Sequence, residues 1–118
     1  MADHGLFVGW GSAVHGREQK GLQVFGEVME YYQRLQQEGT IESFHTVVLE
    51  PHGGDLNGFA LLMGDREKLG RLRWDEEFQR FIARALLVVE NVGVVGATID
   101  GGLAQLMSMY QQQVGELA

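Results

Sequence analysis

The chain has 118 residues, of which 45% are hydrophobic and 21% charged, and this composition is typical of a globular domain and argues against disorder. Nine basic and sixteen acidic residues give a net charge of −7, which disfavours nucleic acid and anionic membranes as partners. The chain contains no cysteine, so disulfides, thiolate metal sites and thiol catalysis are excluded. We recognise neither a secretory signal nor an apolar run of bilayer length, and we expect a cytoplasmic location.

The length suits one domain over residues 1–118. A short apolar run at residues 6–10 predicts a first strand. Apolar residues then recur every three or four positions between residues 17 and 38, which predicts a helix that buries one face and ends at Gly39. The apolar residues of this face are Leu22, Phe25, Val28, Met29, Tyr32 and Leu35.

Two further strands are predicted in the middle of the chain. Residues 41–49 combine β-branched and aromatic side chains, and residues 59–63 form another apolar run. Residues 50–58, which contain one proline and three glycines, cannot continue a strand. We therefore expect a hairpin with a long connecting loop.

The second half of the chain alternates helices and a strand. Asp65 is expected to cap a short helix that ends near residue 74, and Asp75 to cap a second helix that ends within residues 86–89. Residues 92–99 predict the last strand of the sheet. Two glycines then precede an added helix at residues 102–117.

This order of elements predicts an α+β, ferredoxin-like β-α-β-β-α-β fold over residues 6–99, followed by the helix at 102–117. Right-handed crossovers give a four-stranded antiparallel sheet with two helices on one face. The strands nevertheless carry apolar residues on both faces, because Phe59, Leu61 and Met63 alternate with Ala60 and Leu62. A sheet with one wet face would alternate apolar and polar residues. We therefore expect a partner on the second face, and a second copy of the chain is the simplest one.

The arrangement over residues 6–99 resembles the dimeric α/β-barrel superfamily, in which two ferredoxin-like subunits press their sheets together. This superfamily includes antibiotic-biosynthesis monooxygenase-like proteins and muconolactone isomerases. The resemblance is one of architecture and transfers no catalytic residue. It implies a homodimer and leaves three functions open. The first is the binding of a small molecule in a pocket between sheet and helices, which we favour because no catalytic constellation is visible. The others are a cofactor-independent monooxygenase- or isomerase-like enzyme, and a non-catalytic assembly module.

Polar residues of three connections are expected to meet at one end of the sheet. These are the loop after the first strand, the loop of the hairpin and the entry to the last strand. Such a cluster suits a polar group of a small molecule or a general base. The ligand-binding candidates are Ser12, Arg17, Asp55 and Asn57, and the acid–base candidates are His15, His45 and His52.

Two patterns in the sequence superficially suggest a metal or cofactor site. His15, His52 and Asp55 are conceivable metal ligands, but they lack tight ligand spacing, and a solvated loop is favoured. The glycines at residues 9–16 do not match the dinucleotide fingerprint, so we expect neither a metal nor a cofactor.

Several large side chains are interpreted as packing groups. Trp10 and Trp74 are expected to be packing anchors. The last predicted helix carries its apolar residues on one side, where they indicate core or interface. These residues are Leu103, Leu106, Met107, Tyr110 and Val114, and Met109 lies nearby.

Overall fold

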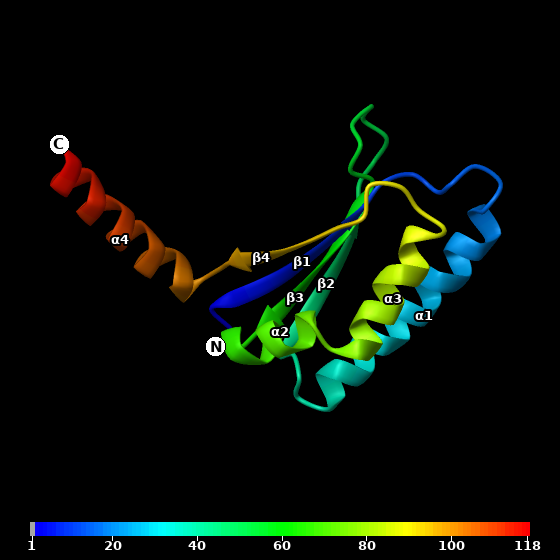
Figure 1. The fold of residues 1–118 in the computed structure, drawn as a ribbon, viewed down its shortest axis with the longest axis horizontal. Helices are drawn as coiled ribbons and strands as arrows, with labels where there is room; N and C mark the ends of the chain where they lie inside the picture. The colour runs from blue at the N-terminus through cyan, green and yellow to red at the C-terminus, as the bar shows by residue number, and fades with distance from the viewer. Residues whose placement is uncertain (1) are drawn as a thin grey trace.

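The structure, a computed structural model, describes residues 2–118 and has the expected order of elements. The strands and helices are β1 (His4–Trp10), α1 (Glu18–Gln37), β2 (Ser43–Val48), β3 (Gly58–Gly64), α2 (Arg66–Arg73), α3 (Glu76–Leu86), β4 (Gly93–Thr98) and α4 (Gly101–Leu117). The strands form one antiparallel sheet in the order β2-β3-β1-β4. Helices α1 and α3 lie along one face, and α2 packs against β1 and β3 (Figure 1). The predicted ferredoxin-like fold is confirmed.

Local signals in the sequence set the ends of the helices. The Asp65 carboxylate accepts a hydrogen bond from the Lys68 backbone N–H at 3.0 Å and thereby caps α2. The Asp75 carboxylate caps α3 by accepting from the N–H of Glu77 at 3.0 Å. Gly39 follows α1 with a φ of +80°, which glycine adopts without strain. These three predictions are confirmed.

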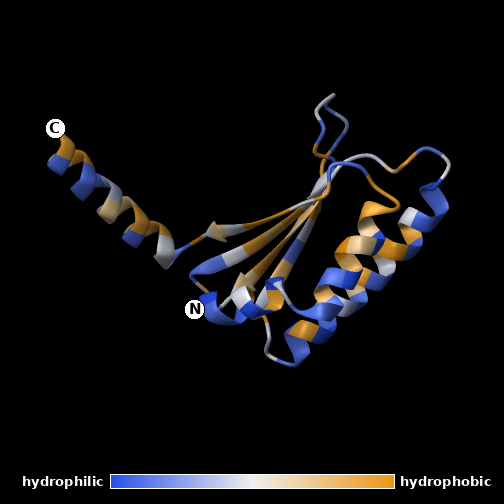
Figure 2. Cartoon of the chain, viewed as in Figure 1, coloured by the Kyte–Doolittle hydropathy of each residue, from blue (hydrophilic) through white to orange (hydrophobic). Residues whose placement is uncertain are grey.

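The hydrophobic core lies between the sheet and the helix layer (Figure 2). Ala60 and Leu62 of β3 are 0% exposed and point toward the helices. Leu6 of β1 joins them, and Phe78 of α3 closes the core from the other side. Alternate residues of each strand are therefore committed to this layer.

The opposite side of the sheet is also apolar, and we call it the open face. Strand pairing places His45 opposite Leu61, Leu61 opposite Phe7, and Phe7 opposite Val95. The flanking row contains Phe59, whose ring stacks on that of Phe7 with centroids 5.1 Å apart. Helices α1 and α3 lie on the other side of the sheet, and α4 points away from it (Figure 1). The expectation of apolar residues on both faces is confirmed.

Helix α4 projects from the body of the molecule (Figure 1). Its main contact is with β4, and Gly102 is its one buried residue in the described part of the chain. None of the helices in residues 2–118 is both long and apolar enough to cross a membrane.

The two tryptophans have different environments. Trp10 packs edge-on against Phe25 of α1, with ring centroids 5.9 Å apart, as expected of a packing anchor. Trp74 is 72% exposed, so the same prediction is wrong for this residue. Trp74 lies at the C-cap of α2, where the chain turns into α3. Its ring contacts only the Arg73 guanidinium, 4.5 Å from the ring centroid, among the aromatic and cation contacts described.

Candidate functional site

A pocket of about 510 Å³ opens between the end of the sheet and helices α1 and α3. We call it the Trp10 pocket. Apolar side chains make up most of its lining, which is the usual composition of a site for a small organic ligand. Among the residues that define it are Trp10, Phe25, Val28, Phe81, Ala85 and Val92.

The first two turns of α1 border the Trp10 pocket and are poorly covered by the rest of the chain. Leu22 is 70% exposed and Phe25 is 38% exposed, although both belong to the apolar face of the helix. Exposed large apolar groups beside a pocket are a common mark of a binding site. The predicted site did not include these residues, because their periodicity is also that of an ordinary buried helix face.

Three connections meet at the polar edge of this region, as expected from the topology. The N–H of Gly11 donates to the carbonyl of Glu90 at 2.7 Å, and the N–H of Asn57 donates to the carbonyl of Trp10 at 2.8 Å. The Asn57 side-chain amide donates to the Ser12 hydroxyl at 3.2 Å. Asn57 lines the Trp10 pocket, so the structure brings two of the ligand-binding candidates together beside it.

His52 is engaged within its own loop. The N–H of Gly54 donates to its Nδ1 at 3.1 Å, and its Nε2 lies 2.8 Å from the carbonyl of Leu56. Because Nδ1 accepts, the ring proton of the neutral imidazole is on Nε2, which donates to Leu56. Asp55 lies exposed in the same loop. Neither side chain lines the Trp10 pocket.

The other candidates lie apart from one another. His15 and Arg17 are exposed on the segment that enters α1, and neither lines the Trp10 pocket. His45 lies on the open face of the sheet, opposite Leu61. Within residues 2–118, no three His, Asp or Glu side chains gather as a metal site would require, so His15, His52 and Asp55 do not form one.

Tyr31 and Tyr32 place two phenols where the pocket meets the core. Burial raises the pKa of both hydroxyls above the ordinary value for tyrosine, and the charges of Glu77 and Asp75 add to this effect at Tyr31. The Tyr31 hydroxyl is buried and makes no hydrogen bond with any described residue. Both groups therefore stay protonated at neutral pH.

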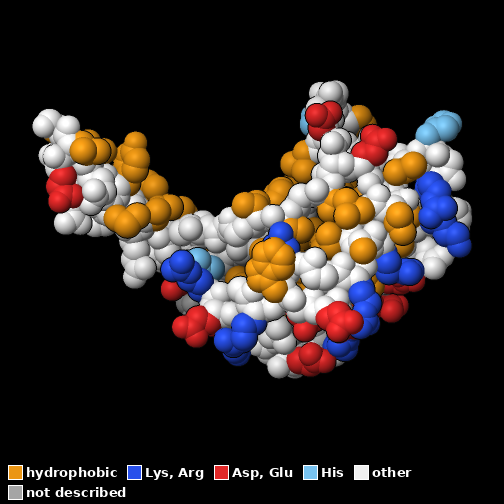
Figure 3. Space-filling model, in the orientation of Figure 1, with side chains coloured by type: hydrophobic (Ala, Val, Ile, Leu, Met, Phe, Trp, Pro, Cys, Tyr) orange, Lys and Arg blue, Asp and Glu red, His pale blue; other side chains and the backbone are white. Residues whose placement is uncertain are grey.

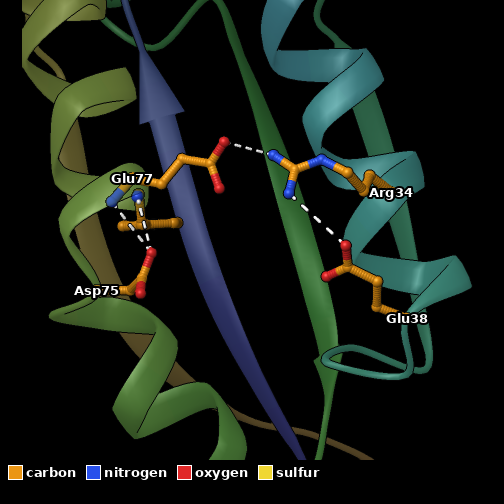
Figure 4. A network of polar contacts seen from close by, with 5 residues as sticks. Arg34, Glu38, Asp75 and Glu77 are labelled. Carbon is orange, nitrogen blue, oxygen red and sulfur yellow. Dashed lines mark hydrogen bonds and ion pairs between the residues drawn. The ribbon is translucent and has the colours of Figure 1, made fainter.

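A second hollow, of about 450 Å³, lies between the C-terminal end of α1 and helices α2 and α3. Its lining holds three basic and three acidic side chains, and those of Arg34, Glu38 and Glu77 form ion pairs (Figure 4). The Arg34 guanidinium pairs with Glu77 and also lies 3.6 Å from a carboxylate oxygen of Glu38. Because these charges compensate each other, the Trp10 pocket is the better candidate for ligand binding.

No protein-family model and no curated protein matches the sequence. Solved structures do match the fold. A DABB family protein with a ferredoxin-like fold from Mesorhizobium loti matches with a TM-score of 0.63 at 12% identity, over 84% of this chain and 99% of its own. A dimeric ferredoxin-like protein of unknown function from Jannaschia sp. has a TM-score of 0.61 at 14% identity, over 81% of this chain and 98% of its own.

SnoaB from Streptomyces nogalater, described as a cofactor-independent oxygenase, has a TM-score of 0.54 at 17% identity, over 84% of this chain and 95% of its own. These similarities show that the chain has a ferredoxin-like fold. At such low identity they establish the fold and not the function.

Proposed function

We propose that this chain is a cytoplasmic homodimer that pairs through the open faces of its sheets and binds a small apolar molecule in the Trp10 pocket. The lining of the pocket is the observation that carries the proposal, because a mostly apolar concavity with a few polar groups at its edge is the usual form of a small-molecule site. A module that serves only to assemble would need no such space. The pocket therefore favours ligand binding over the assembly function.

The homodimer follows from the composition of the open face. Phe7, Phe59 and Leu61 are only partly covered by their own chain, and large apolar patches of this kind mark contact surfaces. Similar structures from Bacteroides fragilis and Jannaschia sp. are described as dimeric. Pairing two open faces would bury both patches at once, as in an isologous interface.

The lining of the Trp10 pocket defines the class of ligand. Its walls are aliphatic and aromatic, and Asn57 offers an amide at one side. Glu18 also lines the pocket and disfavours an anion. The best fit is a neutral, largely apolar molecule with one hydrogen-bonding group near Asn57.

The test is a fluorescence and thermal-shift screen with neutral naphthalene derivatives and medium-chain alcohols. In the Trp74→Phe variant Trp10 is the only tryptophan, so its emission reports on the pocket. A compound that binds should change this emission and raise the melting temperature.

A matched pair of variants on α3 locates the binding. Ala85 is partly buried and lines the pocket, whereas Ala83 is exposed on the same helix. Ala85→Leu should weaken binding because the larger side chain narrows the pocket, and Ala83→Leu should bind as the parent does. Equal binding by both variants would exclude this pocket as the site.

A cofactor-independent oxygenase or isomerase is the second candidate. The fold likeness to SnoaB and the Asn57–Ser12 hydrogen bond beside the pocket favour it. None of the four histidines lines the pocket, so Asn57 becomes the first residue to test. Oxygen uptake in the presence of a compound found by the screen, lost in Asn57→Ala while binding persists, would support this function; oxygen uptake at the buffer rate would contradict oxygenase activity.

A further inference from the structure

Helix α4 carries an apolar stripe that its own chain leaves uncovered. We call it the arm stripe, and its residues are Leu103, Met107, Tyr110, Val114 and Leu117, with exposed fractions between 46% and 87%. Glu116 is the only charged residue of the helix. A helix of 17 residues gains most of its stability by packing an apolar face against other elements. The arm stripe therefore needs a surface that this chain does not supply.

The arm stripe does not lie on the side of α4 that faces its own body. Gln105, Leu106 and Met109 line the cleft between α4, α2 and the end of the sheet, so they mark the side of α4 that faces its own body. At about 100° per residue, the arm stripe is centred about 110° around the helix from that side. Folding α4 against its own α2 would consequently leave most of the stripe exposed.

The space next to α4 is a hollow that hydrophobic side chains border on both sides. Figure 3 shows these side chains along α4 and along the facing part of the body, with the hollow between them. A second copy that packs on the open face would also occupy this hollow. Two uncovered apolar surfaces of one chain would then meet a single partner.

We propose that the arm stripe packs on the partner subunit, so that the two copies of the dimer exchange their C-terminal helices. This inference rests on the proposed sheet-to-sheet dimer. Two-fold symmetry makes the exchange reciprocal, because each copy gives one arm and receives one. A second copy fits better than a charged partner, since the stripe itself has no charged side chain to pair.

The number of residues in the interface also supports a second copy of the chain as the partner of the arm stripe. A stable interface uses about 20 to 30 residues from each side. The open face alone offers three rows of four paired positions. Adding the five residues of the arm stripe gives 17 positions, and the surface that receives the partner's arm adds to this number.

Site-specific photocrosslinking of the chain of residues 1–118 tests the exchange. The chain has no cysteine, so Tyr110→Cys and His45→Cys each accept a single benzophenone-maleimide label. Tyr110 reports on the arm stripe and His45 on the open face. In the purified protein both labels should give crosslinked species of about twice 13.1 kDa.

The two labels separate failure of the arm exchange from failure of the dimer. Crosslinks between chains at position 45, with only intramolecular products or none at 110, would overturn the exchange and leave the sheet-to-sheet dimer in place. Crosslinks between chains at 110 alone would overturn the sheet pairing and the arrangement inferred from it. Chains that stay monomeric with both labels would overturn both proposals.

A charge-matched pair of double variants provides an independent readout. Met107→Asp with Tyr110→Asp puts two charges into the arm stripe, and should raise the dimer dissociation constant at least tenfold because each carboxylate would lose its hydration. Ser108→Asp with Gln112→Asp puts the same charges on the far side of the helix and should leave the constant within about twofold. Equal dissociation constants for the two variants would contradict the exchange. Near-ultraviolet circular dichroism checks that both variants are folded.

Discussion

The Tyr31 hydroxyl is buried in the helix layer without a hydrogen-bond partner among residues 2–118, while its ring stacks on Phe81 with centroids 4.6 Å apart. Tyr31→Phe would keep the stacking and remove the unpaired polar group. We expect the free energy of unfolding at pH 7 to rise by about 1 kcal/mol, since an unsatisfied buried hydroxyl is destabilising. Urea denaturation measures this change. A loss of stability would show that the hydroxyl makes a favourable contact, for example with an ordered water.

The same phenol predicts how stability depends on pH. Burial raises the pKa of Tyr31 in the folded state, whereas in the unfolded chain the pKa is near 10. The stability that this difference in pKa confers is fully present below pH 10. It is lost as the pH rises above 10, because the Tyr31 hydroxyl then loses its proton more readily in the unfolded chain than in the folded one. The loss is about 1.4 kcal/mol per pH unit for each such group.

Tyr31→Phe should therefore flatten the decline of the unfolding free energy between pH 10 and pH 11. Tyr110→Phe serves as the control, because Tyr110 is 63% exposed and should leave the slope unchanged. Parallel curves for the parent and Tyr31→Phe would contradict the assignment.

At the scale of single residues, the sequence correctly predicted those roles that depend only on residues nearby in the chain. The caps Asp65 and Asp75 belong to this class, because the N–H groups they accept from lie two or three residues away. The exposure of Trp74 was not predictable, since it depends on whether another element covers the α2–α3 junction. The ring contacts of His52 depend on the folded form of its loop, which the glycine content of the sequence left open.

Successive side chains of strand β3 point to opposite faces of the sheet, so neighbouring residues should respond differently to substitution. Leu62 is 0% exposed in the core, so Leu62→Ala should lower the free energy of unfolding by about 2 to 5 kcal/mol. Leu61 lies on the open face, so Leu61→Asp should dissociate the proposed dimer and leave a folded monomer. Urea denaturation and analytical ultracentrifugation measure the two effects. Dimerisation of Leu61→Asp with parental affinity would show that the open face is not the interface.

At the scale of elements, apolar patterns and capping residues together predicted every strand and helix, with small differences at their ends. The first strand begins at His4 because it pairs with both Gly64 and Thr98 there, and such pairing involves residues far apart in the sequence. Periodicity could not reveal the Trp10 pocket. Leu22 and Phe25 follow the same pattern as the buried residues of α1, and only the path of the neighbouring elements leaves them exposed.

At the scale of the whole molecule, we expect a particle of about twice 13.1 kDa in light scattering at micromolar concentration. The positions of the open face include no Asp, Glu, Lys or Arg, and each copy has a net charge of −7. Salt should therefore leave the dimer intact or strengthen it, because it screens the repulsion between copies. A monomer at these concentrations, or a dimer that dissociates as salt is added, would contradict an apolar interface.

The first turn of α4 determines where its far end is placed. A Cβ atom at Gly102 would lie 2.5 Å from the backbone oxygen of Asp3 and 3.0 Å from Cγ2 of Thr98. The helix is about 25 Å long at 1.5 Å per residue, so a tilt of about 10° at its base would move its tip by roughly 4 Å. A small change at the base of α4 therefore produces a large displacement at its tip, and the contacts at position 102 leave room only for glycine. The added methyl group of Gly102→Ala would tilt the helix and move its tip away from the surface on which it packs.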